Sequence, residues 1–82
     1  MRLKIYSPTQ QQEYEIVYLE VETSMGNFVI LEGHAPLILM LTAGRPVTFC
    51  QQATPESFER FAATHGGILK VTRTDATLIL ND

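Results

Sequence analysis

The sequence has few of the features that mark secreted or membrane-spanning proteins. Its single cysteine, Cys50, cannot form a disulfide within the chain, which indicates a reducing compartment. The longest unbroken apolar run is Leu37–Leu41, far short of the ~20 residues that cross a bilayer. The first residues alternate charged and apolar side chains and lack the continuous apolar stretch of a signal peptide. We therefore expect a soluble, intracellular protein.

Charged residues are also scarce, at 18% of the chain, and the positive ones are scattered. Six lysines and arginines against nine acids give a net charge of -3, without the basic stripe of a nucleic-acid-binding protein. Five acids nonetheless fall within residues 13–32: Glu13, Glu15, Glu20, Glu22 and Glu32. This cluster is compatible with a solvated strand face and with a docking surface for a basic partner.

The length of 82 residues leaves room for one small domain, residues 1–82, and for no second one. A domain of this size buries roughly 60–65% of the surface that its unfolded chain exposes. A deep active site is therefore not expected. The low charge also favours a surface that is partly covered by another protein.

What the sequence does contain is a series of short strand patterns separated by turn residues. Apolar and polar residues alternate over residues 2–6, and β-branched and aromatic residues recur over 47–50, 68–72 and 76–80. Turn signals follow roughly every 8–12 residues. This organisation predicts an all-β sandwich or barrel.

The longest expected strand, residues 13–23, changes its buried side along its length. Tyr14, Ile16 and Tyr18 occupy even positions, whereas Leu19 and Val21 occupy odd ones. A slip of one residue indicates a bulge, or a strand that leaves one sheet and joins another at a sandwich corner.

Residues 55–65 carry conflicting signals. An N-cap, a proline suited to a first helical position and apolar residues at helical spacing favour a helix: Thr54, Pro55, Phe58, Phe61 and Ala62. The same stretch, leading into a Gly-Gly turn, can also form one arm of a hairpin. The local pattern leaves helix and strand open.

No motif for phosphate binding, metal binding or nucleophilic catalysis occurs in the sequence. His34 and His65 are far apart and lack a cysteine pattern, and Cys50 is expected to pack as a small apolar residue. We therefore expect no catalytic residue, no cofactor and no metal ligand. A small enzyme that uses His34 or His65 remains an alternative, and it would require histidines in a pocket with perturbed pKa values.

The most specific pattern is the run Gly33-His34-Ala35-Pro36-Leu37, preceded by Gly26, Phe28 and Ile30. Spacing alone favours a plain β-turn with a surface histidine. The run resembles, however, the stretch Gly-x-Phe/Leu-x-Ile-x-x-Gly-His-Ala-Pro-Leu of the epsilon subunit of F-type ATP synthase, called delta in mitochondria. The resemblance runs from residue 3 to residue 82. It includes a Gly-Gly-x-Leu-x-Val match and a similar closing segment: Gly66, Gly67, Leu69, Val71 and residues 78–82.

The resemblance implies a flattened β-sandwich or barrel of about ten short strands, one of them at residues 58–64, without the family's C-terminal helical hairpin. It implies a non-catalytic rotor subunit of the central stalk that couples proton-driven c-ring rotation to ATP synthesis. The implied partners are the gamma subunit and the c-ring, with no cofactor and no nucleic acid. The implied location is peripheral, at the cytoplasmic face of the bacterial plasma membrane or its organelle equivalent.

Carried onto this sequence, the resemblance implies a gamma-subunit interface at Gly33, His34, Ala35 and Pro36. It implies a c-ring-facing turn at Ser24, Met25, Gly26 and Asn27. The chain departs from the family at three positions: Val29 stands where glycine is usual, Glu32 where proline is usual, and Asn27 where an acid is common. The alternative to a stalk subunit is a free-standing β-sandwich adaptor that binds some other protein.

Overall fold

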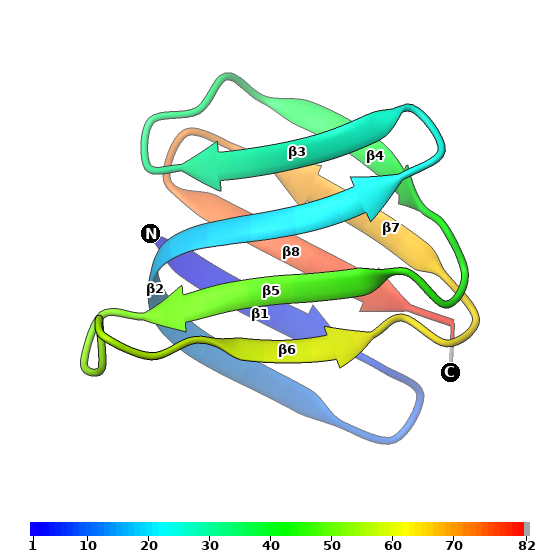
Figure 1. Cartoon of the computed structure of the whole chain (residues 1–82), viewed down its shortest axis with the longest axis horizontal. Coiled ribbons are helices and arrows are strands. Elements are labelled where there is room, and N and C mark those ends of the chain that lie inside the picture. Colours follow the sequence, from blue (N-terminus) through cyan, green and yellow to red (C-terminus); the bar gives the residue numbers. More distant parts are fainter. Residues whose placement is uncertain (82) are drawn as a thin grey trace.

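The computed structural model describes residues 1–81, which form eight β-strands and no helix (Figure 1). Asp82, the last residue of the expected domain and of its closing segment, lies outside the described residues. No helix of this described part is long and apolar enough to cross a membrane. The strands are β1 (Arg2–Tyr6), β2 (Gln11–Thr23), β3 (Gly26–Leu31), β4 (Leu37–Leu41), β5 (Pro46–Gln51), β6 (Glu59–Ala62), β7 (Gly67–Val71) and β8 (Asp75–Leu80).

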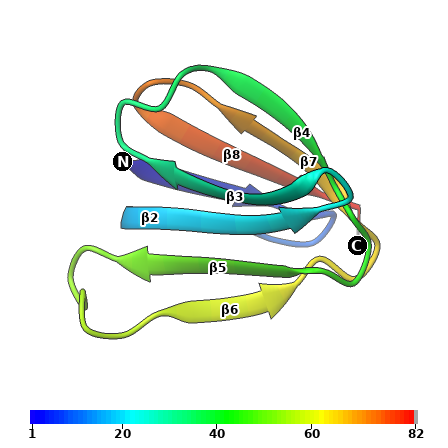
Figure 2. The same cartoon turned by 45° about the horizontal axis from the view of Figure 1, so that its top comes forward.

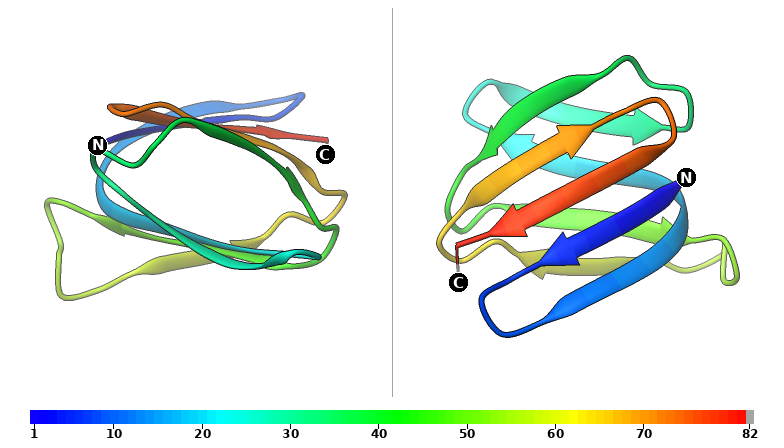
Figure 3. Two further views of the ribbon diagram at one scale, coloured as in Figure 1. Left: turned by 90° about the horizontal axis from the view of Figure 1, so that it is seen from above. Right: turned by 180° about the vertical axis from the view of Figure 1, so that it is seen from behind.

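The strands form two layers that face each other across the core (Figures 2 and 3). The back sheet has the order β4-β7-β8-β1 and ends with the first half of β2. The front sheet contains β3, the second half of β2, β5 and β6. Among the described strands only β1 and β8 pair in parallel, with Arg2 opposite Asp75. The predicted all-β sandwich is confirmed, and it is not closed into a barrel.

One strand, β2, belongs to both sheets, as the slip in its sequence predicts. Its first half pairs with β1, and its second half lies between β3 and β5. The register with β5 shifts between Ile16 and Tyr18, and Ile16 and Leu19 are buried whereas Val17 is exposed. The buried side therefore changes one step earlier than the alternation indicates. Tyr18 belongs to the outer side of the front sheet.

The core is built from inward-facing side chains of both sheets. Aliphatic side chains that are almost completely buried come from six strands: Leu3, Ile16, Leu19, Val21, Ile30, Val47, Leu69, Val71 and Leu78. Phe49 adds an aromatic cluster, with ring centroids 4.9 Å from Tyr14 and 6.5 Å from Phe61. No polar or charged residue is buried within residues 1–81. The described core is therefore apolar, with the thiol of Cys50 buried at its margin.

The eight strands are fewer than the ten or so that the resemblance implies. One reason is that β2, with 13 residues, supplies a strand to each sheet without a break. Another is that residues 52–58 form a loop held by turn hydrogen bonds. In this loop the N–H of Thr54 donates to the Gln51 carbonyl and the N–H of Ser57 to the Thr54 carbonyl.

The ambiguous segment 55–65 is a strand in its second part. β6 pairs with β5 from Glu59 opposite Phe49 to Ala62 opposite Pro46. This pairing brings Phe61 against the core ring of Phe49, whereas a lone three-turn helix would have little apolar surface to cover. The strand implied by the resemblance is confirmed and is shorter than residues 58–64.

Candidate functional site

The predicted gamma-facing segment, residues 33–36, connects the end of β3 in the front sheet to the start of β4 in the back sheet (Figure 1). Gly33 has a φ of 83°, a conformation that side-chain-bearing residues rarely adopt. Its N–H donates to the Arg73 carbonyl in the β7–β8 turn at 3.0 Å, and the N–H of His34 donates to the Leu31 carbonyl at 3.0 Å. The segment is therefore anchored to both sheets.

The two histidines are not brought together. Because β4 and β7 are antiparallel, His34 before β4 and His65 before β7 lie at opposite ends of this strand pair. The Nδ1 atom of His34 lies 2.7 Å from the Ala35 carbonyl oxygen, and His65 is exposed. No group of three His, Cys, Asp or Glu residues within residues 1–81 is arranged to hold a metal ion. The geometry offers nothing in favour of an enzyme that uses either histidine.

The thiol of Cys50 is buried, as predicted, with 3% of the residue exposed. Its Sγ atom lies 3.2 Å from the Ser57 carbonyl oxygen and 3.4 Å from that of Pro55. A thiol is a weak donor, so these contacts tie the loop of residues 52–58 to β5. The role of Cys50 is packing.

The predicted c-ring-facing segment, residues 24–27, comprises the turn between β2 and β3 and the first two residues of β3. The Thr23 hydroxyl accepts from the N–H of Met25 and donates to the Gly26 carbonyl, each at 3.1 Å. Met25 is 83% exposed at the tip. The two predicted segments thus lie at opposite ends of β3, and the four strand residues 28–31 between them span about 13 Å at roughly 3.3 Å per residue.

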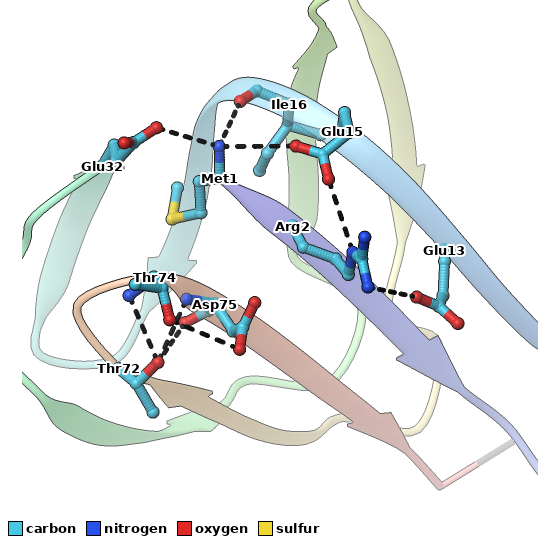
Figure 4. A network of polar contacts seen from close by, with 9 residues as sticks. All are labelled: Met1, Arg2, Glu13, Glu15, Ile16, Glu32, Thr72, Thr74 and Asp75. Atoms are coloured by element: carbon cyan, nitrogen blue, oxygen red, sulfur yellow. Dashed lines mark hydrogen bonds and ion pairs between the residues drawn. The ribbon is translucent and has the colours of Figure 1, made fainter.

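The acids of residues 13–32 are divided between different neighbours. On the outer side of the back sheet, Arg2 pairs with Glu13 at 3.7 Å and with Glu15 at 3.4 Å (Figure 4). Glu15 and Glu32 lie 3.8 Å and 3.2 Å from the amino group of Met1. Each of these acids therefore has a cation beside it.

The remaining two acids lie on the front sheet. Glu20 accepts a hydrogen bond from the side-chain amide of Asn27 at 2.7 Å, and Glu22 pairs with Arg45 at 3.5 Å. The five acids therefore form no continuous negative patch. The structure favours the interpretation of solvated strand faces over that of a docking surface for a basic partner.

The outer side of the back sheet carries an apolar patch that the sequence analysis missed. Met40, Ile68 and Ile79 lie directly opposite one another on β4, β7 and β8, and Ile38 lies two residues from Met40 on β4. Their exposed fractions are 78%, 42%, 49% and 69%. We call these four residues the apolar patch. It adjoins residues 33–36, because β4 follows that segment directly.

The signal for this patch was present in the run Leu37–Leu41. Successive side chains of a strand point to opposite sides of the sheet, so a continuous apolar run cannot turn all of its side chains into one core. Leu37, Leu39 and Leu41 are partly or fully buried, whereas Ile38 and Met40 are exposed. The interpretation of the run as a core strand is therefore right for the inward-facing leucines and wrong for the two exposed residues between them.

Residues 1–82 match the family model described as the β-sandwich domain of the delta/epsilon chain of ATP synthase. No curated protein sequence matches the chain.

Solved structures show the same fold. A chain from the central stalk and c-ring of the Tetrahymena thermophila mitochondrial ATP synthase has a TM-score of 0.82 and 15% identity, over 100% of this chain and 63% of that chain. A chain from the OSCP/F1/c-ring part of the Euglena gracilis mitochondrial ATP synthase, in rotational state 1, has a TM-score of 0.84 and 13% identity. The match covers 98% of this chain and 49% of that chain. The protein therefore spans between about half and two thirds of these relatives.

Proposed function

The chain belongs to the delta/epsilon β-sandwich family of ATP synthase, and on that premise we propose that it is a non-catalytic rotor subunit of the central stalk. In this role it binds the gamma subunit and the c-ring and couples proton-driven rotation to ATP synthesis by partner subunits. Catalysis belongs to those partners. The single observation that carries the proposal is the family match over residues 1–82.

The geometry of β3 supports a role between two partners. Residues 33–36 are proposed to contact gamma and residues 24–27 to contact the c-ring, and about 13 Å of strand separates them. A rotor element that is held at two separate points resists rotation relative to either partner better than one held at a single point. The continuous backbone of β2 through both sheets stiffens the domain between these points.

The apolar patch supports an extended contact with gamma. Four large apolar side chains on three adjacent strands form a surface that a free domain would expose to water. Because the patch adjoins residues 33–36, one partner can cover both. We propose that gamma covers the outer side of the back sheet together with this segment.

The proposed location follows from the complex. The domain is peripheral and reaches the membrane only through its partners. Its place is the cytoplasmic face of the bacterial plasma membrane or the equivalent face in an organelle.

The test is complex formation with the cognate gamma subunit at roughly micromolar concentration, followed by size-exclusion chromatography. We expect co-elution. Met40→Lys should weaken the complex at least about tenfold, because it puts a charge at the centre of the buried surface. The matched control is Val29→Lys, which alters an exposed apolar residue of the front sheet and should leave the affinity unchanged.

Each outcome has a distinct meaning. If no complex forms with gamma, the proposal of a rotor subunit is contradicted, and the free-standing adaptor becomes the better interpretation of the apolar patch. If Val29→Lys weakens the complex and Met40→Lys does not, the rotor subunit stands and the contact lies on the front sheet.

A further inference from the structure

A groove of about 490 Å³ opens between the two sheets on the side where the sandwich is not closed. It lies between β6, at the edge of the front sheet, and the β1–β2 hairpin of the back sheet, at the bottom of Figure 1. Within residues 1–81, β6 pairs only with β5, so no strand joins the two sheets on this side. The core is accessible to solvent here.

The floor of the groove is aromatic. It is lined by the ring cluster of Tyr14, Phe49 and Phe61, with Ile5 and Leu80 beside it. Tyr14, Phe61 and Leu80 pack against the core but are only partly buried. Their apolar surface therefore remains in contact with water, and a ligand that covers it gains the free energy of that burial.

The rim of the groove is polar. On β2 the side chain of Gln12 shares the inward side with Tyr14, since Gln12 pairs with the buried Ile5. Further uncharged hydrogen-bonding groups come from the hairpin turn: Ser7, Thr9 and Gln10. On β6 the side chain of Glu59 shares the inward side with Phe61, whereas that of Arg60 points to the outer side. The Glu59 carboxylate accepts a hydrogen bond from the Gln51 side-chain amide and disfavours a negatively charged ligand.

We propose that this groove binds a small, flat aromatic molecule whose edge carries uncharged hydrogen-bonding groups. Its volume and its combination of an aromatic floor with a few polar groups are those of small-molecule sites. Offset or edge-to-face packing on the rings of Tyr14 and Phe61 would hold the body of the ligand. The glutamines and hydroxyls of the rim would bind its edge.

The site is separate from the surfaces of the proposed function. Its lining includes no residue of segments 24–27 or 33–36 and none of the apolar patch. Binding at the groove therefore stands or falls independently of binding to gamma.

The experiment is a titration of the isotopically labelled full chain with indole, followed by backbone amide signals in NMR. Indole has one ring N–H on a flat aromatic body and so represents the proposed chemistry. We expect saturable shifts at Gln12, Phe49 and Phe61. The Kd should be on the order of 1 mM, because a ligand of so few atoms has little binding energy to gain.

Adjacent glutamines of β2 provide a matched pair of variants. Gln12→Trp directs an indole ring into the groove and should abolish the saturable shifts. Gln11→Trp directs the same ring to the opposite side of the strand and should leave the Kd unchanged, because Gln11 pairs with the outward Tyr6. Both positions are exposed, so both variants should fold, and their amide spectra verify this.

Three results would overturn the proposal. The first is the absence of saturable shifts in the groove. The second is equal binding by the two tryptophan variants. The third is a set of shifts centred on Ile38 and Met40, which would mean that indole adheres to the apolar patch instead.

Discussion

The outer sides of the two sheets differ in how their apolar residues are distributed. On the back sheet, apolar side chains extend over three adjacent strands, through Met40, Ile68 and Ile79. On the front sheet, exposed apolar side chains of β3 such as Val29 lie at the edge, while the neighbouring β2 carries Glu20. A partner that covers β4, β7 and β8 meets apolar side chains on all three strands, with Lys70 opposite Ile38, whereas on the front sheet Glu20 lies directly opposite Val29.

This difference shows what outward-facing positions reveal. Inward positions of both sheets are apolar because the shared core requires it, so they say nothing about partners. Outward positions can be polar at no cost to the core, yet on the back sheet the four positions of the apolar patch are apolar. The exposed side of a strand is therefore the informative one for interaction, and the following variants compare the two sheets in order of expected effect.

The largest expected effect comes from glycine in the back sheet. A Cβ atom added at Gly67 would collide with the backbone of Ile79 and Leu80 on the adjacent strand, which cannot move aside. We expect Gly67→Ala to destabilise the domain by more than about 3 kcal/mol or to prevent folding. Urea unfolding measures this.

Gly26→Ala in the front sheet is the control for Gly67→Ala. A Cβ atom at Gly26 meets no atom within 4 Å, so only its φ of 126° opposes substitution. The expected cost is about 1–2 kcal/mol. Equal losses for the two variants would contradict the close approach of β7 and β8.

An intermediate effect is expected at the connection between the sheets. Gly33→Ala introduces strain at a φ of 83° without a steric clash, and it weakens the hydrogen bond from the Gly33 N–H to the Arg73 carbonyl. We expect a loss of about 1–2 kcal/mol in the free energy of unfolding. Hydrogen exchange should also accelerate at Gly33 and leave Gly67 protected; unaltered exchange at Gly33 would refute the anchoring role.

Smaller effects are expected from the surface ion pairs. Arg2 on the back sheet forms ion pairs with two carboxylates, and Arg45 beside the front sheet forms an ion pair with one. Arg2→Met should therefore cost about 0.5 kcal/mol and Arg45→Met about 0.2 kcal/mol, because exposed pairs are screened by water. Urea unfolding at low and high salt separates this charge effect from packing. The free energy of unfolding that Arg2→Met removes should become smaller as the salt concentration rises, and a salt-independent loss would contradict a contribution from the ion pairs.

The smallest effect on stability is expected at the apolar patch itself. Replacing both Ile38 and Met40 by threonine should change the free energy of unfolding by less than about 0.5 kcal/mol, since these positions are exposed. Light scattering of the isolated chain should decrease. Replacing both Val29 and Leu31 by threonine should decrease the light scattering less. A larger decrease for this front-sheet variant would show that the front sheet contributes more to self-association.

Sequence patterns predicted the parts of the fold that depend on local alternation. The strands, the turns and the passage of β2 between sheets all follow from which side of a strand is apolar. The position of the passage was misplaced by one step because Tyr18 is apolar enough to appear inward while lying on the outer side. The helix-like signals after Thr54 are overridden by pairing with β5, which packs Phe61 against Phe49.

The candidate surfaces were only partly predictable. The resemblance identified residues 24–27 and 33–36, and their roles remain predictions. The apolar patch and the groove arise from alignment between strands far apart in sequence. Ile68 lies between Met40 and Ile79 in the patch, and Phe49 lies between Tyr14 and Phe61 in the groove. Such alignment depends on strand register across the sheets, which no local pattern contains.

The parallel pairing of β1 with β8 has a consequence for biosynthesis. Because Arg2 pairs with Asp75, β1 can meet its parallel partner only after β8 has left the ribosome. Until then, β1 lacks one of its neighbours and β7 lacks its link to β1. Contacts between residues so distant in sequence form slowly. The domain should therefore complete its folding only after β8 has been synthesised, and before that stage the core face of β1 is available to chaperones.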